Sequence, residues 1–313
     1  MNLRAAEPED AQAVLALLAA RDTADLGAPD CTLADVRQEW ASPRLHLAGD
    51  TVVAETAGQL AGYAVIRRPG TYAVVAPGHE GGGIGTSLRR WAEDHDRRHR
   101  RLYHRQLVAR ENRRGRAHLR TAGYRILRTY WRMAVALDVI PPVGETPDGV
   151  LLRRPDLGAD AVGLHRLDAV SFGANADYEL EPFDVFSAEH LVAHDLEPAL
   201  SRVAVHDGRI IGFTLTRHRE HARVGFIDLL AVHPDFRRRG VARSLLAQTF
   251  AACARAGLRE AQLGVASDNP AALALYEQVG MSAQFGFDAF ERPVSGRARG
   301  DASGVAHAGH QAA

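Results

Sequence analysis

Apolar positions in the first half of the chain follow helical and strand-like spacings in turn. Residues 8–21 carry apolar side chains at helical spacing behind an acidic first turn, which predicts a helix. Residues 51–68 predict a β-hairpin that turns at Gly58. The same criteria predict a strand at 72–76, a helix at 84–100, a strand at 106–109, a helix at 112–122 and mostly strand at 124–138.

The second half repeats this order of elements. Leu152 and Arg153 open a strand as Leu3 and Arg4 do in the first half. Further on, the pattern predicts a helix at 159–171, a hairpin at 202–217, a strand at 224–232, a helix at 239–256, a strand at 261–266, a helix at 269–279 and a strand at 284–292. The alternation predicts an α/β chain built from two similar halves.

Each half contains an apolar strand, a turn, a glycine-containing loop and a helix, in that order. In the second half this segment reads VHPDFRRRGVA from Val232 to Ala242, and in the first it reads VAPGHEGGGIG from Val75 to Gly85. The offset of 157 residues also relates Asn112 to Asn269 and Gly123 to Gly280, whereas the hairpins align nearer 150, at Gly62 and Gly212. We therefore expect a duplication in which one half has been altered.

A Pro/Gly-rich segment at 141–147 separates the two halves. We expect one domain over residues 1–140, a linker over 141–150 and a second domain over 151–293. The Gly/Ala/His-rich end, 294–313, has little to bury and is predicted to be a disordered tail.

Composition narrows the class of protein. The chain has 313 residues, 46% of them hydrophobic, and a formal net charge of zero, so no overall field points to nucleic acid or to a membrane. We find no run of 18 apolar residues and no signal peptide. Cys31 and Cys253 give neither a metal-ligand spacing nor a disulfide framework. We expect a cytoplasmic protein with no metal, nucleic-acid partner or membrane association.

The loop from Arg237 to Ala242 has the features of an anion site. Unpaired amides at a helix N-terminus attract an anion, and Gly240 lets the backbone approach it closely. Arg237, Arg238 and Arg239 would add charge-assisted contacts. The loop lacks the Gly-Lys-Ser/Thr ending of a Walker motif. The triple glycine of the first copy lacks the acidic partner of a dinucleotide site.

Two motifs together resemble the GNAT acetyltransferase family in its tandem two-domain form. Val-x-Pro-x-x-Arg-x-x-Gly-x-Ala at 232–242 looks like the acyl-CoA pyrophosphate loop, and Asn269 to Met281 looks like a second block of that family. The resemblance is strong over 150–292 and weak over 1–138. It implies two GNAT-like domains, each a mixed, mostly antiparallel twisted sheet flanked by helices, with acetyl-CoA as cosubstrate. The implied acyl-CoA contacts are Leu230, Ala231, Val232, Arg237, Arg238, Arg239, Gly240, Val241, Ala242, Arg243, Asn269 and Ala272.

Acetyl transfer to an amine needs a base for the amine and a proton for the departing thiolate. Tyr276 is the candidate acid, because a phenol can protonate a thiolate that it contacts, and the resemblance places it beside the CoA sulfur. Asp228 is the candidate base. It stands in an otherwise apolar strand, where burial would raise the pKa of its carboxyl. A salt bridge to an arginine such as Arg223 would explain the same aspartate. The alternative bases are His218, Glu220, His221 and His233.

The stretch from Ser171 to Asp195 is the candidate acceptor wall. Its aromatic and acidic side chains would suit a cationic amine, although they are also typical of an ordinary helix–loop–helix surface. These residues are Phe172, Tyr178, Phe183 and Phe186 together with Asp177, Glu179, Glu181 and Asp184.

The first copy lacks the proposed chemistry at the matching positions. At the offset of 157 residues, Thr71 matches Asp228, Leu119 matches Tyr276 and Glu80 matches Arg237. We therefore expect a catalytically inactive first domain that binds acyl-CoA weakly or only supports the second. Ten arginines within 97–120 are interpreted as a solvated face or as CoA phosphate contacts rather than as a nucleic-acid patch.

The sequence thus predicts an N-acetyltransferase whose second domain transfers acetyl from acetyl-CoA to a primary amine of a small molecule or peptide. Direct attack is expected, because neither cysteine lies in a motif typical of an acyl-enzyme. Two alternatives stay open: a more specialised tandem member of the same family, and a non-catalytic acyl-CoA-binding or regulatory protein.

Overall fold

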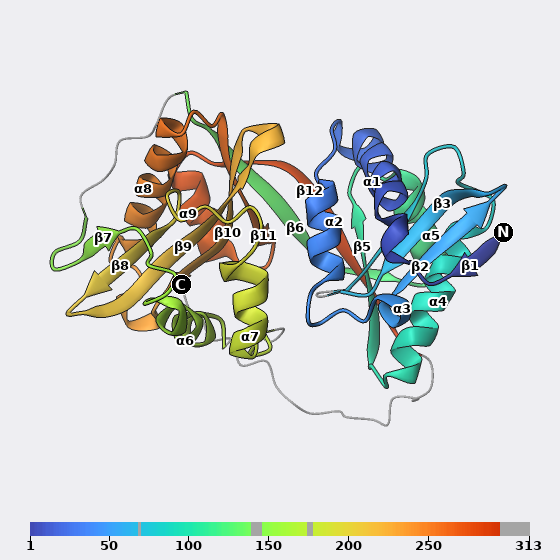
Figure 1. The fold of residues 1–313 in the computed structure, drawn as a ribbon, viewed down its shortest axis with the longest axis horizontal. Coiled ribbons are helices and arrows are strands. Elements are labelled where there is room, and N and C mark those ends of the chain that lie inside the picture. Colours follow the sequence, from blue (N-terminus) through green and yellow to red (C-terminus); the bar gives the residue numbers. More distant parts are fainter. Residues whose placement is uncertain (68–69, 139–145, 174–177, 295–313) are drawn as a thin grey trace. The chain divides into compact units, whose positions relative to one another are not determined.

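The computed structural model describes residues 1–67, 70–138, 146–173 and 178–294. The chain divides into two packed units (Figure 1). The first contains Met1–Tyr130 and the chain from Phe285 onward, and the second contains Trp131–Gln284. The predicted tail beyond Val294 and the first half of the predicted linker, 141–145, lie outside the described residues.

The first unit is built on a mixed sheet. Its strands lie in the order β1 (Asn2–Arg4), β2 (Thr51–Thr56), β3 (Gln59–Val65), β4 (Thr71–Val75), β5 (Tyr103–Ala109) and β12 (Ser282–Pro293). Neighbouring strands are antiparallel except for β4 and β5, which are parallel. The helices are α1 (Ala11–Leu26), α2 (Leu33–Trp40), α3 (Leu47–Asp50), α4 (Ile84–Arg98) and α5 (Arg113–Thr121).

The second unit repeats this arrangement. Its strands lie in the order β7 (Leu151–Arg153), β8 (Arg202–His206), β9 (Arg209–Arg219), β10 (Val224–Val232), β11 (Glu260–Ala266) and β6 (Arg125–Ala136). Strands β10 and β11 form a parallel pair, as β4 and β5 do. The helices are α6 (Ala161–Phe172), α7 (Phe183–Phe186), α8 (Val241–Arg255) and α9 (Pro270–Gln278), with one π-turn at Ser187–Leu191. The mixed α/β fold predicted from the sequence is confirmed.

The last strand of each repeat runs from its own unit into the other one. Strand β6 begins in the first unit, but its Met133 and Val135 lie in the core of the second. Strand β12 begins in the second unit and then pairs with β5 from Phe287↔Ala109 to Pro293↔Tyr103. The boundaries predicted from the sequence, 1–140 and 151–293, follow the repeat, whereas the packed units exchange their last strands.

Matching contacts recur in the two copies. Arg4 pairs with Asp10 near the start of the first copy, and Arg153 pairs with Asp160 near the start of the second, each at 2.6 Å. Gly62 and Gly212 allow the helix after the loop to pack tightly on the hairpin. A Cβ at Gly62 would lie 2.6 Å from Ile84, and a Cβ at Gly212 would lie 3.2 Å from Val241 and from a backbone oxygen. A side chain at Gly62 would therefore displace Ile84, and one at Gly212 would require its neighbours to shift slightly.

Several short helical elements were not predicted. Helix α2 has eight residues and a capping box in which Thr32 and Asp35 bond each other's backbone N–H. Helix α7 and the π-turn after it occupy part of the predicted acceptor wall. Such short elements carry too few turns for a clear apolar periodicity. Among the described residues, every helix falls short of the length and hydropathy that crossing a bilayer requires.

Candidate functional site

The predicted anion loop of the second unit has the expected backbone. A short turn at Pro234–Phe236 follows β10, and α8 begins at Val241. Two residues in between are left-handed, Arg238 with φ 59° and Gly240 with φ 85°. Left-handed residues at alternate positions beside a helix N-terminus turn neighbouring N–H groups toward one point, and such a concavity holds an anion. The backbone therefore has the geometry of an anion site, and its contact with acyl-CoA stays a prediction.

The arginine side chains of this loop play different roles. Arg237 donates from Nη2 to the carbonyl of Ser171 at 2.7 Å and from Nε to the carbonyl of Val232 at 3.3 Å. The guanidinium of Arg239 lies over the Phe236 ring, 5.3 Å from its centroid. Arg238 is exposed and has no hydrogen-bond partner within the described part of the chain. Of the three arginines predicted to meet the diphosphate, Arg238 is thus the one whose side chain is uncommitted.

Strands β10 and β11 separate beside this loop. Their parallel register runs from Val224↔Glu260 to Ile227↔Leu263 and, in the described residues, goes no further. Beyond that point β10 stays paired with β9, through Val232↔Gly212. The edge of Leu229–Val232 that faces β11 thus has main-chain groups that can pair with an extended ligand. This is where the sequence placed Leu230, Ala231 and Val232.

Two other predicted contact residues lie on α9. Asn269 is the N-cap of that helix, and its Oδ1 accepts from the amide of Ala272 at 3.1 Å. On α8, Arg243 donates to the side chain of Gln278 at 2.7 Å. The structure therefore gives Asn269 and Arg243 structural contacts, and their contact with acyl-CoA stays a prediction.

Asp228 occupies a β-bulge. The register with β9 passes from Ile227↔Thr216 directly to Leu229↔Leu215, so no residue of β9 lies opposite Asp228 in the ladder. Ile227 packs in the core under α8, whereas Leu229 packs against the core that includes Leu164 of α6. A bulge re-aims side chains. Here it sets Asp228 and Leu229 toward the same layer of helices.

An imidazole and a guanidinium hold the Asp228 carboxylate. Its Oδ2 lies 2.7 Å from Nδ1 of His190 and 3.1 Å from Nη2 of Arg217. Burial raises the pKa of Asp228, but the hydrogen bond from His190 and the charge of Arg217 outweigh it, so the pKa lies below its usual value. The prediction that burial raises the pKa of Asp228 above its usual value is therefore wrong. The alternative partner Arg223 instead donates to the carbonyl of Gly257 at 2.6 Å.

His190 and Arg217 were missed by the sequence reasoning. Arg217 also donates to the carbonyl of Glu189 at 2.8 Å and pairs with Asp195 at 3.2 Å. Burial lowers the pKa of His190, whereas Asp228 and Glu181 raise it, and the net effect is upward. One signal was available: an aspartate in an apolar strand needs a cationic neighbour, and Arg217 lies on the adjacent strand of the same hairpin.

The role of acid predicted for Tyr276 requires that its hydroxyl is free to donate a proton. The side chain is 8% exposed and packs in the core cluster that Leu230 of β10 also contacts. Burial raises the pKa of Tyr276 to about 12, so the hydroxyl stays protonated at neutral pH. Within the described residues the hydroxyl has no hydrogen-bond partner. It is therefore a free donor for a ligand atom.

The acceptor wall divides into core and surface. Phe186 is fully buried and Phe183 is 41% exposed. Tyr178 donates to Asp168 at 2.9 Å. Glu181, Glu189 and His190 each place a side-chain nitrogen or oxygen within 4.8 Å of the others, which suits an ammonium group. Asp177 lies outside the described residues.

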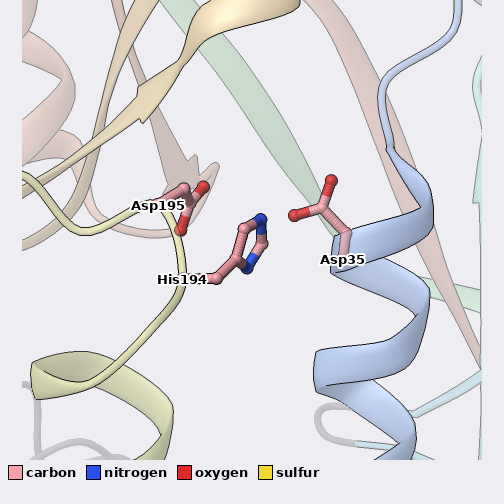
Figure 2. A group of neighbouring side chains, drawn as sticks. All are labelled: Asp35, His194 and Asp195. Atoms are coloured by element: carbon pink, nitrogen blue, oxygen red, sulfur yellow. The ribbon is translucent and has the colours of Figure 1, made fainter.

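Figure 2 shows His194 and Asp195 on the loop that follows the π-turn, where Asp195 meets Arg217. The third side chain drawn there, Asp35, belongs to α2 of the first unit. In the second unit this loop joins the acceptor wall to strand β9, since the amide of His218 donates to the carbonyl of Asp195 at 2.7 Å.

The first unit keeps the shape of the loop. Gly81 and Gly83 are left-handed, with φ 87° and 85°, as Arg238 and Gly240 are at the matching positions. Glu80 pairs with Arg21 at 2.8 Å and with Arg114 at 3.5 Å. The residues that match Tyr276 and Asp228 are Leu119 and Thr71, and both are buried. The loop persists here without either candidate catalytic side chain.

Several arginines of the 97–120 tract pair with carboxylates. Arg101 lies 3.3 Å from Asp96, Arg105 lies 3.3 Å from Glu291 and Arg116 lies 2.8 Å from Asp288. These pairs offset part of the positive charge. That the tract has no nucleic-acid partner stays a prediction.

Comparison with known proteins gives concordant results. Residues 164–281 match the family described as "Acetyltransferase (GNAT) family". A protein of Geodermatophilus obscurus named mycothiol acetyltransferase is 30% identical over 297 residues, which are 88% of this chain and 92% of that relative. The match spans both units of the chain.

Two solved structures share the fold over nearly the whole chain. A GCN5-related N-acetyltransferase from Sphaerobacter thermophilus has a TM-score of 0.76 and 28% identity, and the match covers 94% of this chain and 95% of that one. A tandem GNAT protein from the clavulanic acid biosynthesis pathway has a TM-score of 0.72 and 19% identity, with 95% and 99% covered. The second likeness is one of fold alone.

Proposed function

The chain belongs to the GNAT acetyltransferase family, and from that premise we propose that its second unit transfers an acetyl group from acetyl-CoA to a primary amine. The first unit has no catalytic role in this proposal. A GNAT acetyltransferase uses acetyl-CoA as its cosubstrate.

One observation carries the assignment to the second unit. The anion loop, a bulged aspartate and a buried tyrosine with a free hydroxyl occur there together, whereas the first unit has the loop with Thr71 and Leu119. Catalysis requires groups that act on the reacting atoms, in addition to those that bind the cosubstrate. The loop alone supports binding only.

Each part of the second unit has a proposed task. The amides from Arg238 to Ala242, together with the Arg238 side chain, bind the diphosphate. The free edge of Leu230–Val232 pairs with the pantetheine arm. The Tyr276 hydroxyl gives its proton to the thiolate of CoA. Asp228 and its neighbours His190 and Arg217 form the group that removes the proton of the amine. Acetyl-CoA supplies the activated acyl group when bound.

Direct attack by the amine fits the state of Cys253, which lies in the second unit, better than an acyl-enzyme does. Burial raises the pKa of Cys253 to about 12, so its thiol is protonated and unreactive at neutral pH. The cysteine is fully buried, and its sulfur lies only 2.4 Å from where a Cβ at Gly225 would stand. Its environment is that of a packed core residue.

A more specific acceptor is a second candidate. The sequence also resembles mycothiol synthase in its tandem architecture, and the Geodermatophilus obscurus relative named mycothiol acetyltransferase matches over both units. An acetyltransferase that makes mycothiol from an amine would use the precursor that lacks the acetyl group. We therefore propose this precursor as the first acceptor to test, with small-molecule and peptide amines beside it.

Mass spectrometry of reactions with acetyl-CoA tests the proposal. The full chain would be incubated with the amine precursor of mycothiol, a polyamine, an amino sugar and a peptide with a free α-amine. We expect enzyme-dependent acetylation of at least one of them. Saturable acetyl-CoA binding with no acetylated product would favour the rival, a non-catalytic acyl-CoA-binding protein.

A further inference from the structure

We propose that the imidazole of His190 takes the proton of the acceptor amine and that Asp228 is a positioning residue for it. This inference rests on the proposed function, because it concerns the amine side of that reaction. The observation behind it is a chain of contacts from Arg217 through Asp228 to His190.

The contacts of Asp228 suit an orienting role. Its Oδ2 receives Nδ1 of His190 at 2.7 Å and Nη2 of Arg217 at 3.1 Å. A carboxylate that already accepts from the Arg217 guanidinium and from the N–H of the His190 imidazole has little affinity for a further proton. Arg217 is itself fixed, since it also bonds the Glu189 carbonyl and Asp195. The carboxylate is thus held in the position from which it orients the His190 imidazole.

The contact to Asp228 selects the tautomer of His190. A carboxylate accepts a hydrogen bond, so Nδ1 carries the proton and Nε2 of the neutral ring has a lone pair. In hydrolases with a Ser-His-Asp triad, an aspartate orients the general base in the same way. Asp228 and His190 therefore have the geometry of such a pair, in which Nε2 is the basic atom.

The backbone and packing around His190 hold the ring in this orientation. His190 lies on the π-turn, where the amide of Val192 bonds the carbonyl of Ser187 at 3.0 Å. π-Turns inside helices occur frequently at functional sites. The ring of fully buried Phe186 packs against the imidazole, with centroids 5.1 Å apart. The His190 side chain is 17% exposed, which leaves a route to it.

The surroundings of Nε2 suit a cationic acceptor. Oε2 of Glu181 lies 3.7 Å from Nε2, and a carboxylate there attracts an ammonium group to the basic nitrogen. The main chain of Glu181 is anchored, because its carbonyl lies 2.7 Å from Nε2 of His165. The expected acceptor is therefore a primary amine that arrives as its ammonium form.

Every proton in the proposed reaction is accounted for. The ammonium group gives one proton to Nε2, and the amine lone pair then forms the N–C bond at the thioester carbonyl. The C–S bond breaks, Tyr276 protonates the departing thiolate, and the second proton of the nitrogen restores the Tyr276 hydroxyl. His190 releases its proton to solvent, so acetylation of an ammonium yields one proton overall.

The charges around His190 set the direction of the pH dependence. Asp228 and Glu181 raise the pKa of His190, against burial and Arg217. Activity should therefore rise with pH through a midpoint above the usual histidine value of about 6.5. The titratable or charged groups that face His190 or its immediate partners are Asp228 on β10, Arg217 on β9, Glu181 before α7, Glu189 on the π-turn, Asp168 and His165 on α6, and Asp195 beside Arg217.

Kinetic pH profiles of His190→Gln and Asp228→Asn test the proposal. With acetyl-CoA and the best amine of the panel, His190→Gln should lower kcat/KM by about 10²–10⁴-fold and abolish the rising limb. Asp228→Asn should keep the limb, with its midpoint moved to lower pH, because His190 loses the carboxylate that raises its pKa. The Kd of acetyl-CoA should stay unchanged in both. A limb that survives in His190→Gln and disappears in Asp228→Asn would overturn the proposal.

Nuclear magnetic resonance of histidine-labelled wild-type protein gives an independent readout. One imidazole should titrate above about pH 6.5 and move to lower pH in Asp228→Asn. If every histidine titrates as before in that variant, the pairing is refuted whatever the activity. If the wild-type chain acetylates none of the amines, the proposed function fails, while this titration still decides whether His190 and Asp228 form the pair.

Discussion

Nη2 of Arg237 lies 2.7 Å from the carbonyl oxygen of Ser171 and so joins the anion loop to the end of α6. The first unit has a related link of opposite polarity, in which Arg21 of α1 pairs with Glu80 of the loop at 2.8 Å. In both copies the loop is tied to the first long helix. Glu80 is thus part of a structural link, and its charge is met by Arg21 and Arg114.

Replacing Arg237 by alanine should weaken both the fold and cosubstrate binding. The carbonyls of Ser171 and Val232 lose their donor, so we expect the free energy of unfolding to fall by about 1–2 kcal/mol. The Kd of acetyl-CoA should rise as the loop loosens. Chemical denaturation and calorimetry measure the two effects. Arg238→Ala is the control, since its exposed side chain should change the Kd alone. An equal loss of stability in both variants would contradict the assignment.

Replacing Tyr276 by phenylalanine should lower kcat by about 10²–10⁴-fold, because the departing thiolate loses its proton donor. The Kd of acetyl-CoA should stay within about twofold in calorimetry. Tyr124→Phe is a matched control in the first unit, where the hydroxyl donates to Glu93 at 2.6 Å. That variant should lose stability by about 1–2 kcal/mol and keep its turnover. Unchanged turnover in Tyr276→Phe would remove this residue from the mechanism.

Asp22→Asn should stabilise the protein at neutral pH. Burial raises the pKa of Asp22 to about 6, above its ordinary value of 3.8. The protonated form is thus the one the fold prefers, and the contribution of Asp22 to stability falls as pH rises from about 4 through 6. An asparagine avoids this loss, so the variant should gain up to about 3 kcal/mol at pH 8 and almost nothing at pH 4. Denaturation curves at the two pH values check the sign.

Asp96→Asn should behave in the opposite way. Burial raises the pKa of Asp96, but His104 at 2.6 Å and His95 outweigh it and lower the pKa to about 2. The ionised form stabilises the fold above pH 4, and this stabilisation disappears as pH falls toward 2. The variant should therefore lose up to about 2 kcal/mol at pH 7, and the loss should shrink in acid. A loss independent of pH would point to packing instead.

Local elements could be predicted from the sequence because their signals are local. Strand β10 was predicted at 224–232 and lies at Val224–Val232. Helix α9 was predicted at 269–279, and its cap Asn269 is the residue at which the pattern begins. The exchange of β6 and β12 was not predictable, because the apolar pattern of a strand does not say which sheet it joins.

The backbone of the candidate site could be predicted from the sequence, whereas its side-chain contacts could be predicted only in part. Gly240 and the strand before it define the anion loop without knowledge of the fold. The contact between His190 and Asp228 depends on a bulge and on a π-turn, neither of which leaves a clear mark in the sequence. The polarity of the Arg237 link could not be foreseen, since its acceptors are backbone carbonyls.

Turnover of two matched glycine variants, Gly240→Asp and Gly83→Asp, tests most directly whether the second unit is the catalytic one. Both glycines have φ 85° and precede the helix of their loop, so the backbone strain and the added carboxylate are alike in the two variants. We predict that Gly240→Asp lowers kcat/KM for acetyl-CoA at least about 100-fold, because its carboxylate meets the diphosphate, and that Gly83→Asp stays within about twofold of wild type. A 100-fold loss in Gly83→Asp with activity retained in Gly240→Asp would contradict the account.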